Sequence, residues 1–280
     1  MTLNSARDAI FERALAGRPL GVPVVDCHGH VGPARGIDRD TSPEAMVALM
    51  DAIGITHSVV SGLMFSPGVR LETMNDWVAE FVREAPDRFL GYCYLNPNYP
   101  EAIDAEIERC FDDLGFAGFK LHVDWNGYPY DSDRYTPVYE YASARRLPIL
   151  AHTWGDDAVR RLAAMARRYP DAMFLAGHSG AGDLAINIEE ALRTPNLFLE
   201  LTYSAGTPWG VERFVREVGA ERVVWGSDSI LFAQSHQVGK VAFARISEAD
   251  KVAILGGNAR RIFGLDGDAA GMAAGAAATG

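Results

Sequence analysis

Short apolar runs rich in β-branched and aromatic side chains alternate along this chain with longer segments that have the periodicity of amphipathic helices. Eight such runs occur, at positions 24–30, 56–61, 89–95, 118–122, 148–152, 173–178, 197–201 and 223–228. Their starts recur at roughly the length of one βα unit, about 30 residues. The alternation predicts an α/β fold with a parallel sheet, and eight units predict a closed (β/α)8, or TIM, barrel.

The runs are almost continuously apolar, as expected for parallel strands that are covered on both faces. Residues 1–23 mix charges with short apolar stretches, for which we expect a short N-terminal helix and a lead-in. Residues 24–265 form the predicted barrel domain. Residues 266–280 are rich in glycine and alanine and offer little to a core, so we expect a disordered C-terminal tail.

The composition fits a globular enzyme and argues against some classes of partner. The chain has 280 residues, of which 48% are hydrophobic and 22% charged, which suits one barrel of about 250 residues. The formal net charge of -11 disfavours a nucleic-acid partner, and no apolar run reaches the roughly 20 residues of a membrane span. Three cysteines without a close pair, and no secretory pattern in residues 1–20, lead us to expect a cytoplasmic protein.

Polar side chains gather at the carboxyl ends of the predicted strands, which is where active sites of such barrels lie. They are His28 and His30 in the first run, Lys120 and His122 in the fourth, His152 in the fifth, His178 in the sixth and Asp228 in the eighth. The five histidines of this set fall at one predicted rim. We therefore expect the functional site there.

His28 and His30 have the two-residue spacing that puts both imidazoles on the same side of a strand, here the barrel interior. Two neutral imidazoles on one face can chelate one ion, although two core histidines satisfied by backbone groups would give the same pattern. Gly29 and Cys27 are expected to face outward, where Cys27 would pack and not bind metal.

His152 and Asp228 would complete a set of three imidazoles and one carboxylate around one divalent ion. Zinc is the ion that we expect, with manganese or another divalent ion as the alternative. Asp228 could instead cap the helix that follows it. His178 could bind a second ion or stay unligated to polarise the substrate, and we favour the unligated role.

Further candidates for contact with a substrate or a second metal lie close to these ligands. Lys120 and His122 share one face of their strand, although a buried lysine can also simply pair with a carboxylate. The loops add Arg35, Trp125, Trp154 and Tyr203, whose alternative role is loop packing. Aromatic walls with a few cations favour a small planar or cyclic organic acid as substrate.

Taken in order, these motifs resemble the amidohydrolase superfamily, and within it the branch related to aminocarboxymuconate-semialdehyde decarboxylase. The similarity runs from Val24 to about Leu265. It rests on VDCHGH (25–30), GFKLH (118–122), LAH (150–152), GHSG (177–180), GSD (226–228) and the closing GNARRIF (257–263).

The resemblance implies a distorted (β/α)8 barrel with one divalent ion held by His28, His30, His152 and Asp228, and with His178 as a catalytic histidine. Superfamily members with two metals often bridge them through a carboxylated lysine on the fourth strand, where Lys120 lies, so a binuclear site is left open. The decarboxylases of this branch tend to be longer than this chain, which argues against decarboxylation.

We therefore expect a metal-dependent hydrolase whose activated water attacks a C–N or C–O bond in an amide, lactone or ester of a small organic acid. Asp228 would accept the proton of the water and pass it to the leaving group, while His178 polarises the carbonyl. The alternatives are a non-oxidative decarboxylase of an aromatic or muconate-like acid, and a non-catalytic barrel that binds a metal or ligand. A homodimer is the default assembly.

Overall fold

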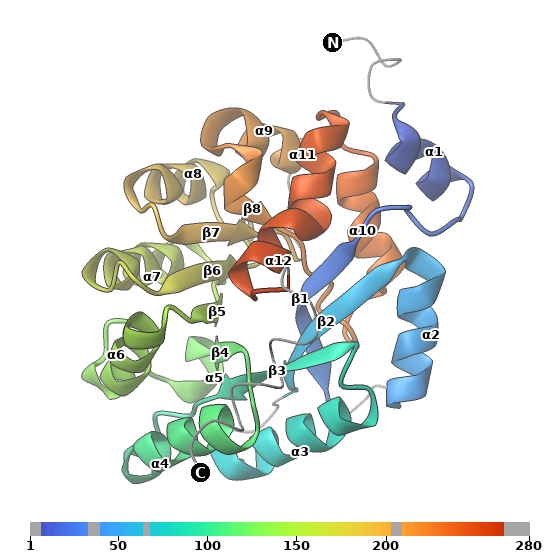
Figure 1. Cartoon of the computed structure of the whole chain (residues 1–280). Helices are drawn as coiled ribbons and strands as arrows, with labels where there is room; N and C mark the ends of the chain where they lie inside the picture. The colour runs from blue at the N-terminus through green and yellow to red at the C-terminus, as the bar shows by residue number, and fades with distance from the viewer. Residues whose placement is uncertain (1–6, 33–39, 64–67, 203–208, 266–280) are drawn as a thin grey trace.

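The barrel predicted from the sequence is present in the computed structural model, which describes residues 7–32, 40–63, 68–202 and 209–265. Eight parallel strands follow one another in the order of the sequence, from β1 to β8 (Figure 1). A parallel bridge between Gly29 and Ser229 joins the segment after β8 to β1, so the barrel is nearly closed. The predicted fold class is confirmed.

The strands largely coincide with the predicted apolar runs. They are β1 (Val24–Val31), β2 (Ile55–Gly62), β3 (Phe89–Tyr94), β4 (Gly118–Leu121), β5 (Pro148–His152), β6 (Met173–Gly177), β7 (Leu197–Glu200) and β8 (Val223–Val224). The last strand is much shorter than the predicted run 223–228. The chain leaves the extended conformation there, and Asp228 has a φ of 56°, in the left-handed region.

Helices surround the sheet, and the last of them, α12, lies over the middle of the barrel in the view of Figure 1. They are α1 (Ala9–Leu15), α2 (Pro43–Ile53), α3 (Leu71–Glu84), α4 (Ile103–Glu108), α5 (Val123–Asn126), α6 (Thr136–Arg145), α7 (Asp156–Arg168), α8 (Leu184–Arg193), α9 (Gly210–Val218), α10 (Gln234–Ala242), α11 (Glu248–Val252) and α12 (Asn258–Ile262). Single turns of 3-10 or π geometry, η2 (Pro100–Ala102), η3 (Arg109–Asp113), η4 (Asp133–Tyr135), η5 (Ala220–Arg222) and η6 (Ala253–Gly257), extend or connect them.

An inner core cluster draws side chains from seven of the eight strands. It contains Val25, Cys27, Val59, Tyr92, Leu150, Leu175, Phe198 and Val224, and α12 adds Ala259 and Ile262. Cys27 therefore packs with this cluster, and the prediction that it faces outward with Gly29 is wrong. The register of β1 against β2 shifts between Asp26 and Gly29, which interrupts the simple alternation of side chains.

Gly29 lies where strands β1 and β2 approach each other closely. A Cβ atom at this position would come within 2.8 Å of Ser58 Oγ and 3.0 Å of Val60 Cγ1 on β2. The absence of a side chain lets β1 pair tightly with β2 between the two histidines. This close pairing places His28 and His30 on the opposite face.

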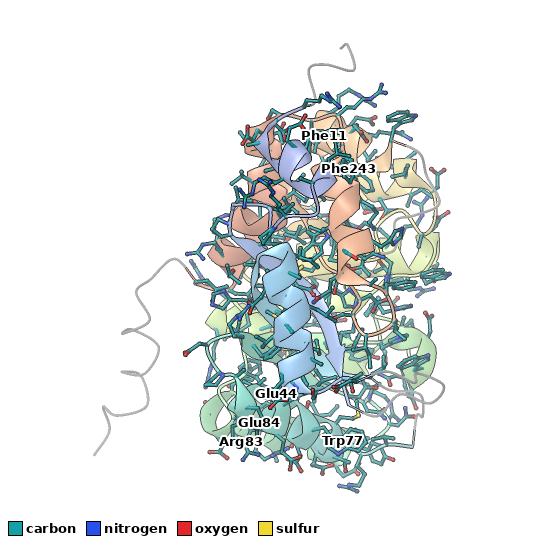
Figure 2. All side chains as sticks on the ribbon, turned by 90° about the vertical axis from the view of Figure 1, so that its right-hand side faces the viewer. Phe11, Glu44, Trp77, Arg83, Glu84 and Phe243 are labelled. Atoms are coloured by element: carbon teal, nitrogen blue, oxygen red, sulfur yellow. The ribbon has the colours of Figure 1, made fainter. Side chains whose placement is uncertain are left out.

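The N-terminal helix α1 packs against the outside of the barrel. Phe11 and Phe243 meet edge to face with ring centroids 5.1 Å apart (Figure 2). The buried Lys251 ammonium lies 2.6 Å from Asp8 Oδ2 at the start of α1. These contacts attach the predicted N-terminal helix to α10 and α11.

The remaining predictions about the domain organisation of the chain are not tested by the structure. The tail 266–280 lies outside the described residues, and the domain boundaries remain predictions. In the part of the chain that the structure describes, no helix is both long enough and apolar enough to span a membrane.

Candidate metal centre and active site

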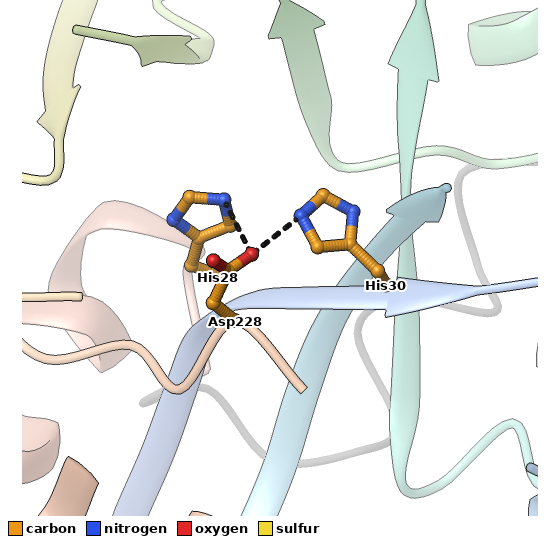
Figure 3. A group of neighbouring side chains, drawn as sticks. All are labelled: His28, His30 and Asp228. Carbon is orange, nitrogen blue, oxygen red and sulfur yellow. Dashed lines mark ion pairs between the residues drawn. The ribbon is translucent and has the colours of Figure 1, made fainter. Parts of the chain in front are cut away.

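Three side chains meet at the carboxyl end of β1 and in the segment after β8. His30 Nε2 lies 2.9 Å from Asp228 Oδ1, and His28 Nε2 lies 3.7 Å from the same oxygen (Figure 3). One ligand atom from each residue lies within 4.8 Å of the other two, and all three side chains are buried. The structure thus brings together three of the four predicted metal ligands.

The backbone ties Asp228 to β1. The Asp228 N–H donates to His28 O at 2.6 Å, and the His30 N–H donates to Ser229 O at 2.5 Å. Helix α10 begins only at Gln234 and has Ala233 at its N-cap position. Asp228 is therefore not the cap of this helix, and its carboxylate is directed to the two histidines instead.

The imidazole of His28 is contacted at both nitrogens. Its Nδ1 lies 3.0 Å from Glu200 Oε2, and its Nε2 lies 2.7 Å from Lys120 Nζ. Burial holds the pKa of His28 well below its usual range, so the ring is neutral. A ring that donates its Nδ1 proton to Glu200 keeps a lone pair at Nε2, which accepts from Lys120. Burial also lowers the pKa of Lys120, to about 8.

The three residues have the donor chemistry that a divalent ion requires. Burial acts to raise the pKa of Asp228, but the hydrogen bond with His30 and the nearby histidines outweigh it and hold the pKa well below its usual range. The carboxylate is therefore ionised. Two imidazoles and a carboxylate suit zinc and manganese alike, and the His28 lone pair that accepts from Lys120 can bind an ion instead.

His152, the fourth predicted ligand, lies outside this group of three. Its Nδ1 is 3.0 Å from His178 Nε2, and its Nε2 is 3.2 Å from Asp124 Oδ2. With His122 and Asp124 it forms a second group of neighbouring ligand atoms. His178 is buried beside the metal group, with its ring centroid 5.0 Å from that of His28, and burial holds its pKa well below the usual range.

Flat rings line the side of the site next to His152. The ring centroid of His122 lies 3.8 Å from that of His152 and 4.1 Å from that of Trp125, and the His122 ring is nearly parallel to both. Trp154, which is 49% exposed, is also nearly parallel to His152, at 6.1 Å. Two further predicted substrate contacts, Arg35 and Tyr203, lie outside the described residues.

Sequence reasoning missed two fully buried carboxylates that support this site. Glu200 contacts the His28 ring, and Asp26 accepts from the His28 N–H at 3.1 Å and from the Ser227 N–H at 2.9 Å. Each is a single acidic residue within an apolar strand run, and that pattern is the signal that could have identified them.

Comparison with known proteins assigns this chain to a family. The model of the amidohydrolase family matches residues 25–265. A gamma-resorcylate decarboxylase from Rhizobium sp. strain MTP-10005 is 26% identical over 293 residues, covering 80% of this chain and 88% of that protein. A shorter match, 30% identical over 81 residues, covers 29% of this chain and 23% of 2-amino-3-carboxymuconate-6-semialdehyde decarboxylase from Dictyostelium discoideum.

Solved structures share the fold. The dihydroxybenzoic acid decarboxylase from Polaromonas sp. JS666, determined with bound manganese and the inhibitor 2-nitroresorcinol, superposes with a TM-score of 0.68 at 19% identity. The superposition covers 88% of this chain and 98% of that one.

These findings correct the expected reaction. Four curated relatives that align with most of this chain are gamma-resorcylate decarboxylases, so the expectation of a hydrolase is wrong. The shorter chain does not argue against decarboxylation either, because 80% of it aligns with 88% of the Rhizobium decarboxylase. Zinc, the expected ion, is not supported by the comparisons, and the Polaromonas decarboxylase was determined with bound manganese.

The family match covers most of the chain, and the shorter match confirms the resemblance to the carboxymuconate-semialdehyde decarboxylase branch. The protein therefore belongs to the amidohydrolase family and is an enzyme of the amidohydrolase superfamily.

Proposed function

We propose that the protein is a metal-dependent decarboxylase that removes the carboxyl group of a small aromatic acid without oxidation. The observation that carries this proposal is the alignment of 80% of the chain with a decarboxylase. The group of His28, His30 and Asp228 supports it, because these residues can hold a divalent ion at the carboxyl end of the barrel.

Non-oxidative decarboxylation replaces a carboxylate with a proton. The bond between the ring carbon and the carboxyl carbon breaks, carbon dioxide leaves, and the electron pair of the bond stays on the ring carbon. A proton then forms the new C–H bond, so the step consumes no oxidant, reductant or water. The site must bind an anion, stabilise negative charge on the ring and supply one proton.

His28, His30 and Asp228 would hold the ion, and His152 would join them if it turned away from Asp124. When bound, the ion supplies positive charge that orients the substrate oxygens and stabilises developing negative charge. Lys120 adds a cationic group beside His28, and the buried carboxylates of Asp228 and Glu200 favour its charged form. This arrangement draws an acid anion to the barrel centre.

His178 is our candidate for the group that passes a proton to the reacting carbon. Burial lowers the pKa of His178, and the negative charge of a bound acid would raise it again and favour the protonated ring. Its side chain is buried, and its Nδ1 has no hydrogen-bond partner among the residues that the structure describes. A buried ring nitrogen of this kind is available to a bound substrate. Burial also excludes bulk water from the reacting carbon.

The walls of the site favour a flat substrate. A cavity of about 260 Å³ is lined by Asp124, Tyr128 and Trp154 among others, and its size suits a single ring. Asp124 also contacts His152, with its Oδ2 3.2 Å from His152 Nε2. A larger apolar cavity of about 420 Å³ lies between α2 and the segment 229–235, and neither of the two cavities is lined by a histidine of the site. We assign substrate binding to the first cavity because Asp124 connects it to the site.

Removal and return of the metal tests the proposal. Protein treated with a chelator should release no carbon dioxide from a panel of hydroxylated benzoates, and added Mn²⁺ should restore release, because the ion supplies most of the positive charge. Lactones and amides in parallel assays should stay intact. Turnover that survives complete metal removal would contradict the proposal, and so would a metal-loaded protein without any turnover, which would favour the non-catalytic barrel.

A further inference from the structure

Glu200 is a fully buried carboxylate at the end of β7 that contacts two functional histidines at once. We propose that Glu200 is the positioning residue of the site: it fixes the tautomer of His28 for the metal and holds the backbone of His178. The inference rests on the metal centre of the proposed function but not on the reaction.

The oxygens of Glu200 accept hydrogen bonds from four donors. Oε2 accepts from His28 Nδ1 at 3.0 Å and from the His178 N–H at 3.2 Å. Oε1 accepts from the Thr202 N–H at 2.7 Å and from the Thr202 hydroxyl. The side chain therefore has a donor on every side and is held in one orientation.

The first consequence concerns the tautomer of His28. A carboxylate that already faces three other donors can only accept from Nδ1, so this nitrogen carries the proton of the neutral ring. The lone pair is then at Nε2, which faces Lys120 and Asp228. With the opposite tautomer, a proton would occupy the position where a metal ion binds.

The second consequence concerns His178. Its φ of 63° lies in the left-handed region, which a residue with a bulky side chain rarely adopts. The hydrogen bond from its N–H to Glu200 ties down this residue at the point where the chain leaves β6. The same carboxylate oxygen thus sets the place of His178 relative to His28.

The packing around Glu200 leaves no room for another arrangement. A Cβ atom at Gly226 would lie 2.6 Å from Glu200 Oε1 and 2.5 Å from His28 Cβ. Only glycine allows the segment after β8 to pass this close to both side chains. Gly226 therefore keeps Glu200 and His28 in contact.

Replacement of Glu200 by glutamine separates positioning from simple packing. Glutamine has nearly the same size, but its amide presents an NH2 donor in place of one oxygen. In either orientation of the glutamine amide, its NH2 group would face two of the four hydrogen-bond donors that surround the carboxylate in the wild type. Thr202→Val is the matched control, because it removes one donor and leaves the carboxylate in place.

Metal affinity measures the effect without reference to turnover. In equilibrium dialysis we expect E200Q to bind Mn²⁺ about 10 to 100 times more weakly than the wild type, and its Co²⁺ form to have a changed absorption spectrum. The control T202V should stay within about threefold of the wild type. If E200Q and the wild type had equal metal affinity and equal spectra, the positioning role of Glu200 would be overturned, and the proposed function would not be affected. A wild type that binds no metal would overturn the proposed function with it.

A measurement on the wild type covers the case in which E200Q does not fold. In metal-free protein labelled with ¹⁵N-histidine, where no ion can select the tautomer, we expect His28 to carry its proton on Nδ1, in a slowly exchanging signal that is absent from H28N. A His28 ring protonated at Nε2, or lacking this protected proton, would refute the positioning role.

Discussion

Replacing Asp228 with asparagine is expected to lower the turnover of the metal-loaded enzyme by about 10³-fold or more. Asp228 is the only carboxylate in the described group of three, and its Oδ1 faces both His30 and His28. The substitution keeps the shape of the side chain but removes the negative charge that balances the ion. The ion should then bind weakly, and the substrate should lose its point of attachment.

The measurement is turnover at saturating Mn²⁺ together with the metal content of each variant. Asp112→Asn is the control, because Asp112 forms an exposed ion pair with Arg145 on the outside of the barrel. We expect the control to match the wild type in both measurements. If D228N turned over within tenfold of the wild type, Asp228 would have no place in the metal centre.

Replacing His178 with asparagine is expected to lower kcat by about 10² to 10⁴-fold while metal binding stays close to that of the wild type. His178 lies beside the group of three and does not belong to it. Its loss should therefore remove the proton donor and leave the ion in place. Asparagine retains the N–H that donates to Glu200.

This split between turnover and metal content defines the role of His178. Steady-state kinetics gives kcat, and dialysis against Mn²⁺ gives the affinity. If H178N lost metal in proportion to its activity, His178 would be a ligand, and the assignment of the proton to this residue would be wrong.

Most of the fold could be predicted from the sequence because strand positions depend on local composition. The run 148–152 is apolar, lies between helical segments and coincides with β5 (Pro148–His152). The run 223–228 was predicted too long, since the left-handed φ of Asp228 follows from hydrogen bonds with β1 and not from its neighbours in sequence. Local pattern cannot report such long-range constraints.

The site could be predicted in part. His28 and His30 are adjacent in sequence, so the spacing of a strand was enough to place them on one face. Glu200 lies 172 positions away from His28, and only the closed barrel brings their side chains together. The partnership of His152 with Asp124 depends on the turn into α5, which the sequence pattern does not describe.

The reaction was the hardest feature to predict. A metal held by histidines and an aspartate serves hydrolysis and decarboxylation alike, because both need positive charge next to a carboxyl or carbonyl group. The residues that hold the ion therefore do not distinguish the two reactions. In the proposed function, substrate choice depends on side chains that line the cavity, such as Trp154 and Tyr128, whose positions are set by the loops that follow the strands.

The exchange of a carboxyl group for a solvent proton is the central claim, and its products test it most directly. Mn²⁺-loaded protein should be incubated in D2O with hydroxylated benzoates labelled with ¹³C at the carboxyl carbon. We predict that one ¹³CO2 is released for each ring that gains one deuterium at the vacated carbon, and that a chelator stops both. Intact carboxyl groups throughout the panel, with the metal site filled, would contradict the account.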